Sequence, residues 1–123
     1  MANPRRILIV EDDAASRLLA AAILEEQGFV VDAAGSAEEA VELIKRSAPD
    51  LILMDIRLPG MDGLQLTRIL KADPSTAAIP VIALTAHMMP LHQRAAIAAG
   101  CSAFITKPVS PATLAAEVRS HIT

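Results

Sequence analysis

The sequence is poor in aromatic residues and in cysteine. It contains two Phe, no Tyr and no Trp, and its single cysteine is Cys101. So few aromatic rings argue against a site that stacks nucleic-acid bases or a flavin. A single cysteine excludes an internal disulfide bond and agrees with a reducing cytoplasm, where we expect the protein to work. We expect Cys101 itself to be a small buried residue.

Positive charge and long apolar runs are also lacking. The net charge is −3 and there is no basic stripe, so electrostatics give no support to nucleic-acid binding. The best candidate for a membrane span, residues 18–24, is short and is flanked by Arg17 and Glu25. The N-terminal sequence MANPRRILIVEDD becomes acidic too early for a secretory signal. We therefore expect neither a nucleic acid nor a membrane as a partner.

What the sequence does contain is an alternation of short apolar runs and helical patterns. Its 123 residues, 53% of them apolar, suit one domain with its own core over residues 1–123. The alternation predicts an α/β fold with five parallel strands and five helices. Strands are predicted at residues 7–10, 29–32, 51–54, 79–84 and 102–105. Helices are predicted at residues 14–27, 36–46 and 62–71. A fourth helix is predicted to follow the fourth strand and to end near residue 99, and a fifth is predicted from residue 111 to the end. The capping signals at helix starts are Ser36 with Glu39, Asp62 with Gln65, and Ser110 before Pro111.

Acidic residues follow two of the predicted strands at their carboxyl ends. Glu11, Asp12 and Asp13 follow the first strand, and Asp55 follows the apolar run LILM of the third. In an open parallel sheet, ligands bind beyond these ends, where the strand order reverses. If the order is 2-1-3-4-5, the acids of strands one and three meet, and crowded carboxylates suit a hard cation such as Mg²⁺. Asp13 fits the N-cap of the next helix, so we place it outside the site.

A hydroxyl and an ammonium group complete the same edge of the predicted sheet. Thr85 follows the fourth strand in ALTAH, and Lys107 follows the fifth strand in FITKP. A metal ion, a lysine and a hydroxyl are the groups that neutralise and bind a phosphoryl group. An aspartate in the position of Asp55 can also be the nucleophile, which forms an acyl phosphate.

These four elements together resemble a known family. The segments ILIVEDD, LILMDIRLPGMDG, ALTA and FITKP, in this order, closely resemble the receiver domain of bacterial response regulators, over essentially the whole chain. The segment AAGCSAFITKPVSPATL is most similar to stand-alone receivers related to DivK. The resemblance implies a flavodoxin-like (CheY-like), doubly wound fold of three layers with strand order 2-1-3-4-5. It also implies a single-domain response regulator of a two-component phosphorelay, without an effector domain, that signals rather than acting as an enzyme in the usual sense.

The resemblance assigns a role to each acidic residue of the site. Asp55 would accept a phosphoryl group from a histidine kinase or a histidine phosphotransfer protein. Asp12 and Asp55 would bind Mg²⁺ directly, Glu11 would bind it through water, and the carbonyl of Arg57 would complete the shell.

The other roles concern the phosphoryl oxygens and the switch. Thr85, Lys107 and the backbone N–H of Ala86 would contact the phosphoryl oxygens. Thr85 and Phe104 would move together and change the surface of the fourth helix, the fifth strand and the fifth helix, where a downstream protein would bind. The bond between Lys107 and Pro108 is typically cis in this family.

Three positions depart from the common pattern or tune it. Phe104 lacks the hydroxyl that a Tyr there would donate, so we expect a different switch readout. Arg57 and His87 lie two residues after Asp55 and Thr85, where side chains tune dephosphorylation. Either residue could shield the phosphate or orient water. We expect a monomer or a weak dimer.

Three other classes of function compete with this one. A phosphatase of the haloacid dehalogenase type needs a second aspartate two residues after the first, where this chain has Arg57. A flavodoxin-like electron carrier needs aromatic rings and hydroxyl-rich phosphate loops, which are lacking. A receiver used as a phosphorylation-independent scaffold stays open as the alternative, and the complete set of acids, hydroxyl and lysine argues against it.

Overall fold

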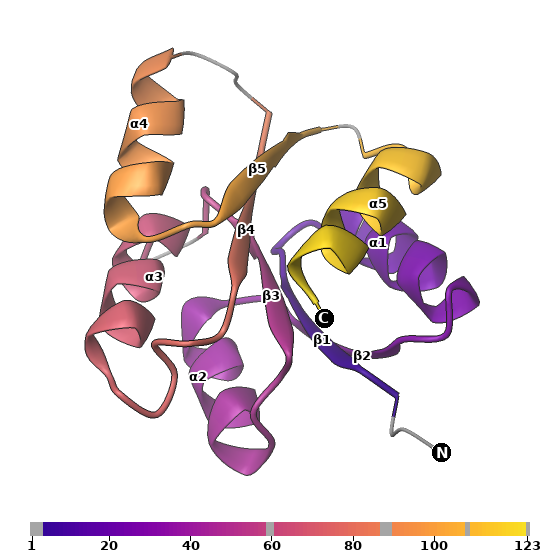
Figure 1. Ribbon diagram of the computed structural model, residues 1–123, viewed down its shortest axis with the longest axis horizontal. Helices are drawn as coiled ribbons and strands as arrows, with labels where there is room; N and C mark the ends of the chain where they lie inside the picture. The colour runs from indigo at the N-terminus through magenta and orange to yellow at the C-terminus, as the bar shows by residue number, and fades with distance from the viewer. Residues whose placement is uncertain (1–3, 59–60, 87–89, 108, 123) are drawn as a thin grey trace.

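The computed structural model describes residues 4–58, 61–86, 90–107 and 109–122, with residues 90–92 described through their backbone alone. Five strands alternate with five helices along the described chain (Figure 1). The strands are β1 (Arg6–Val10), β2 (Val30–Ala34), β3 (Leu51–Asp55), β4 (Val81–Thr85) and β5 (Ala103–Thr106). The helices are α1 (Ala14–Glu26), α2 (Ala37–Arg46), α3 (Gly63–Ala72), α4 (Pro90–Ala99) and α5 (Pro111–His121).

The strands form one parallel sheet in the order β2-β1-β3-β4-β5. Helices α1 and α5 cover one face of this sheet, and α2, α3 and α4 cover the other (Figure 1). This is the three-layer, doubly wound architecture that the family resemblance implied, so that prediction is confirmed. Because the order reverses between β1 and β3, the carboxyl ends of these two strands lie side by side.

The three central strands, β1, β3 and β4, are buried on both faces, which explains why their sequences are almost wholly apolar. Their side chains alternate between two cores. Leu8 and Met54 pack with α2, α3 and α4, whereas Ile7 and Leu53 pack with α1 and α5. Cys101 is buried in the first of these cores, as expected, and burial raises the pKa of its thiol.

Polar caps fix the start of four helices. In each case a side-chain oxygen accepts a hydrogen bond from the backbone N–H three residues later. The capping residues are Asp13, Ser36, Asp62 and Ser110. The reciprocal bond of a capping box is present between Asp62 and Gln65. At Ser36 the predicted box is only half formed, because the Glu39 carboxylate accepts a bond from Gly35 N, at 3.3 Å, one residue earlier.

Strand boundaries differ from the predictions by one to two residues, and the pairing partners decide them. The sequence placed Asp55 and Thr85 after their strands, but both close the strands themselves. Asp55 pairs with Leu84 in the ladder, and Thr85 pairs with Thr106. The strand predicted from residue 79 begins instead at Val81. Asp55 and Thr85 are therefore held by the sheet rather than by mobile turns.

Across the described ranges, none of the helices combines the length and the apolar character needed to span a membrane.

Candidate functional site

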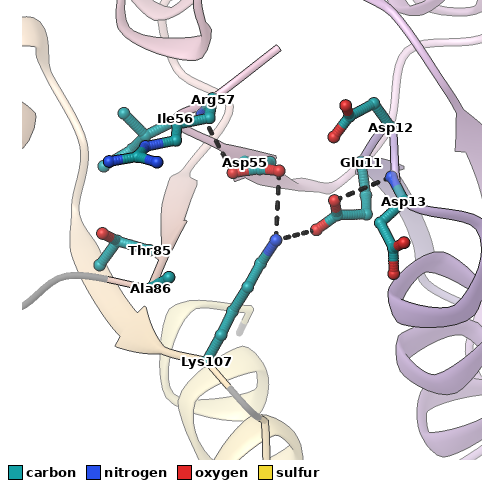
Figure 2. A pocket seen from close by; sticks show the side chains of 9 residues that line it. All are labelled: Glu11, Asp12, Asp13, Asp55, Ile56, Arg57, Thr85, Ala86 and Lys107. Atoms are coloured by element: carbon teal, nitrogen blue, oxygen red, sulfur yellow. Dashed lines mark hydrogen bonds and ion pairs between the residues drawn. The ribbon is translucent and has the colours of Figure 1, made fainter.

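The carboxyl ends of β1, β3, β4 and β5 surround a cavity of about 300 Å³ (Figure 2). Every described residue predicted to bind metal or phosphate lines it. The lining residues are Glu11, Asp12, Asp13, Asp55, Ile56, Arg57, Thr85, Ala86 and Lys107. Residues separated by up to 96 positions (from 11 to 107) thus form one site, because the parallel topology directs their strands toward the same edge.

Glu11 is the most deeply buried acid of the cavity, with 1% of its surface exposed. Its backbone N–H donates to the carbonyl of Ala34 at 2.9 Å, and its Oε1 accepts from the N–H of Asp13 at 3.1 Å. Its Oε2 forms an ion pair with the Lys107 ammonium. Burial raises the pKa of Glu11, although the neighbouring ammonium opposes this effect.

Lys107 lies between two acids. Its Nζ is 3.1 Å from Asp55 Oδ2 and also contacts Glu11, while its backbone N–H donates to the carbonyl of Thr85 at 2.8 Å. Burial alone would lower the pKa of Lys107, but the two carboxylates outweigh burial and raise it. The lysine is therefore held as a cation inside the cavity.

Asp55 is held from two sides at the end of β3. Its Oδ1 accepts a hydrogen bond from the N–H of Arg57 at 3.0 Å, and its Oδ2 accepts from Lys107. The first turn of α3 lies against its backbone: the N–H of Gly63 donates to the carbonyl of Ile56 at 2.9 Å. A Cβ atom on Gly63 would lie 2.0 Å from the Asp55 carbonyl oxygen. Glycine is thus required for this approach. The sequence interpretation missed this need, because it depends on how closely the start of α3 packs against the end of β3.

Three carboxylates of the cavity fit a hard cation. Glu11, Asp12 and Asp55 each offer an oxygen within 4.8 Å of the other two, and Asp12 is exposed to solvent. The donor set is oxygen only, and its three carboxyl groups face a single ammonium group, that of Lys107. Oxygen donors and excess negative charge are what Mg²⁺ requires, so these residues fit that ion.

Asp13 lines the cavity but is occupied in capping α1, as the sequence interpretation held. Its carboxylate accepts from the N–H of Ser16 at 2.8 Å. This bond lowers the pKa of Asp13. The structure therefore leaves Asp13 outside the set of acids that face one another.

The opposite side of the cavity carries a hydroxyl and a backbone amide. Thr85 ends β4 with 8% of its surface exposed, and Ala86 follows it. Figure 2 shows both beside Asp55, on the side away from Glu11 and Asp12. The cavity thus has an acidic side and a hydroxyl side, with Lys107 reaching in between.

The remaining predicted residues lie elsewhere. Phe104 is on β5, outside the cavity, and packs partly buried against the core beneath α2, α3 and α4. His87 and Pro108 are outside the residues that the structure describes. Arg57 lies at the rim with an exposed side chain, and it contacts Asp55 through its backbone.

Comparison with known proteins identifies the family of this chain. A model of the response regulator receiver domain matches residues 7–119. The polar-differentiation response regulator DivK of Brucella anthropi is 36% identical, over 97% of this chain and 97% of DivK. The sensor protein GacS of Pseudomonas syringae pv. syringae is 38% identical over 89% of this chain, which spans only 12% of that sensor.

Solved structures lead to the same family. The crystal structure of a CheY-like response regulator receiver domain protein from Methanospirillum hungatei superimposes with a TM-score of 0.86. It is 33% identical and covers 96% of this chain, while this chain covers 93% of it. With the family match over residues 7–119, the chain belongs to the response regulator receiver domains, the signalling domains of two-component systems.

Proposed function

We propose that this chain is a phosphorylation switch whose phosphoacceptor is Asp55. A histidine kinase or a histidine phosphotransfer protein would supply the phosphoryl group, and a downstream protein would read the result. The observation that carries the proposal is the place of the Asp55 carboxylate, between the Lys107 ammonium, at 3.1 Å, and the acids of β1. The likeness to DivK over 97% of its length, and to part of a sensor protein, supports a role in a phosphorelay.

In the proposed transfer, a carboxylate oxygen of Asp55 attacks the phosphorus of a phosphohistidine. The O–P bond of an acyl phosphate forms, the N–P bond breaks, and the histidine leaves with the electron pair. Lys107 would shift its contact from the carboxylate to a phosphoryl oxygen, while Thr85 and the N–H of Ala86 would donate to the others. The chain would assist only its own phosphorylation and dephosphorylation.

Glu11, Asp12 and Asp55 are the side chains that would hold Mg²⁺, and the Arg57 carbonyl would join them. A bound divalent cation supplies positive charge that offsets the charge of the phosphoryl oxygens and the carboxylates. Arg57 at the rim and His87 are proposed to tune how fast water removes the phosphoryl group.

The proposed output surface is formed by α4, β5 and α5. Phe104 on β5 pairs with Ala83 of β4, two residues before Thr85, so a shift of Thr85 toward a phosphoryl group acts on the strand beside Phe104. Phe104 already packs against the core below α4 and has no hydroxyl, so its readout would be a change of packing rather than a new hydrogen bond. The proposed setting is the cytoplasm, with the chain acting as one domain that is monomeric or weakly dimeric.

The deciding experiment is the intact mass of the protein after incubation with Mg²⁺ and acetyl phosphate. We expect one phosphoryl adduct, lost in Asp55→Asn and in EDTA. An Asp73→Asn variant is the matched control, because Asp73 is an exposed acid at the far end of α3, and it should keep the adduct. If neither acetyl phosphate nor a competent phosphotransfer protein gives an adduct, the chain is a phosphorylation-independent scaffold.

A further inference from the structure

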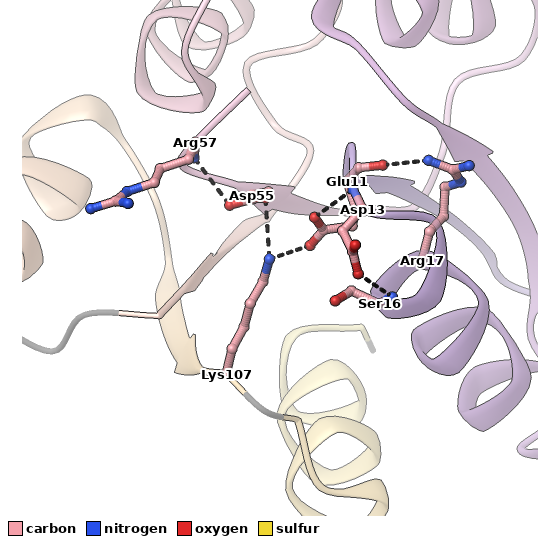
Figure 3. A network of polar contacts seen from close by, with 7 residues as sticks. All are labelled: Glu11, Asp13, Ser16, Arg17, Asp55, Arg57 and Lys107. Atoms are coloured by element: carbon pink, nitrogen blue, oxygen red, sulfur yellow. Dashed lines mark hydrogen bonds and ion pairs between the residues drawn. The ribbon is translucent and has the colours of Figure 1, made fainter. Parts of the chain in front are cut away.

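The acid cluster is formed by Glu11, Asp12 and Asp55. One contact to the backbone of this cluster has no part in the function proposed above. Arg17, half-buried in α1, donates from Nη1 to the backbone carbonyl oxygen of Glu11 at 2.8 Å. Figure 3 shows its guanidinium on the side of Glu11 away from Lys107. Arg17 is not among the residues that line the cavity. Arg17 therefore acts on the backbone of the acidic turn, residues 11–13 between β1 and α1.

This bond completes a set that fixes Glu11 in three ways. Its N–H donates to the carbonyl of Ala34, its carbonyl accepts from Arg17, and its carboxylate accepts from the N–H of Asp13. The turn from β1 into α1 is thereby tied to the end of β2 on one side and to α1 on the other. Because Asp12 lies between Glu11 and Asp13, its backbone is held at both neighbours.

The guanidinium occupies a space that a glycine leaves open. A Cβ atom at Gly35 would lie 3.3 Å from Arg17 Nη1, which is closer than ordinary packing. Gly35 itself donates to the Glu39 carboxylate at the start of α2. Arg17 thus sits where β1, β2 and two helix starts converge.

The choice of acceptor matters for the charge of the site. An arginine paired directly with Glu11 or Asp12 would neutralise a carboxylate and compete with a cation. Arg17 instead bonds a neutral carbonyl, so it orders the turn and leaves the carboxylates to Lys107 and a metal ion.

We propose that Arg17 is a positioning residue for the acid cluster: it fixes the backbone of Glu11 so that the carboxylates of Glu11 and Asp12 face Asp55. The consequence for Mg²⁺ rests on the proposed function, whereas the ordering of the turn does not. Residues behind the ligands of a metal site commonly change its affinity by about tenfold or more when they are replaced.

The test combines amide hydrogen exchange of the metal-free protein with Mg²⁺ titration by calorimetry. In Arg17→Met we expect the amides of Glu11 and Asp13 to exchange about tenfold faster, while Leu53 in the core of β3 is unchanged. The dissociation constant for Mg²⁺ should rise about tenfold. Arg17→Lys, which keeps a charged donor, should restore much of both. Arg68→Met, which removes an exposed arginine of α3, is the matched control and should change neither.

Each other outcome also decides the matter. Unchanged exchange at Glu11 and Asp13 with unchanged Mg²⁺ affinity would overturn the proposal, even if the melting temperature fell, because Arg17 would then only stabilise α1. If Arg17→Met does not fold, Arg17→Gln, whose amide is too short to span the gap, takes its place in both measurements. If the unchanged protein binds no Mg²⁺, the metal part of the proposed function fails, and the exchange rates alone decide the role of Arg17.

Discussion

At the scale of single residues, the cavity is built around one lysine that faces two buried acids. Lys107 contacts both Glu11 and Asp55, whose side chains are 1% and 7% exposed. Removing one partner of such a buried set leaves charges without compensation, which costs more than the intact pair contributes. The lysine therefore has a structural effect in the metal-free protein as well as its proposed role toward phosphate.

A Lys107→Met variant tests this effect. We expect the free energy of unfolding in EDTA to fall by about 3 kcal/mol, because Glu11 and Asp55 lose their shared cation. Urea denaturation measures the change. A Glu11→Gln change made in the same background should recover part of the loss, since one of the two stranded charges is then absent. A double variant that is less stable than Lys107→Met would contradict this account.

At the scale of elements, local sequence predicted the helices and strands well and their ends less well. Asp13, Ser36 and Asp62 carry capping signals that act within one turn, so one chain segment suffices to predict them. A strand ends where its neighbour ends, which no single segment reveals. For this reason Asp55 and Thr85 were predicted just after their strands, although pairing with Leu84 and Thr106 places them inside.

The connection between β3 and α3 depends on Gly63. A Gly63→Ala change puts a methyl group 2.0 Å from the backbone oxygen of Asp55, an atom that cannot move without shifting the strand. We expect a loss of about 3 kcal/mol or more in the free energy of unfolding, together with slower phosphorylation, because Asp55 is displaced.

Gly28→Ala is the comparison for this variant. Gly28 has a φ of 94° but nothing within 4 Å of its notional Cβ, so it reports backbone strain without overlap. That strain costs about 1 kcal/mol. Thermal and urea denaturation of the two variants would separate the two effects, and a loss at Gly63 no larger than the loss at Gly28 would contradict the expected cost of overlap.

At the scale of the whole molecule, the strand order makes the site. Periodicity alone predicted a parallel sheet, but the order 2-1-3-4-5 came from the family resemblance, since no local pattern states which strands are neighbours. Given that order, the meeting of Glu11, Asp55, Thr85 and Lys107 follows from their places at strand ends. The bond from Arg17 to the Glu11 carbonyl does not follow, because it depends on the path of a long side chain across two connections.

A site made by the whole fold binds its ion only when the chain is folded. Unfolding separates Glu11, Asp12 and Asp55, so Mg²⁺ should stabilise the native state. At a concentration 100 times the dissociation constant the gain is about 2.7 kcal/mol, which corresponds to a rise of about 10 °C in melting temperature for a domain of this size. Differential scanning calorimetry with and without MgCl₂ measures it, with NaCl at equal ionic strength as the control. Asp12→Asn should lose most of the rise, because it removes an exposed ligand without leaving a buried charge, whereas Asp73→Asn should keep it. A rise of equal size in Asp12→Asn would place the cation elsewhere on the molecule and would separate the fold of this receiver domain from the chemistry proposed for it.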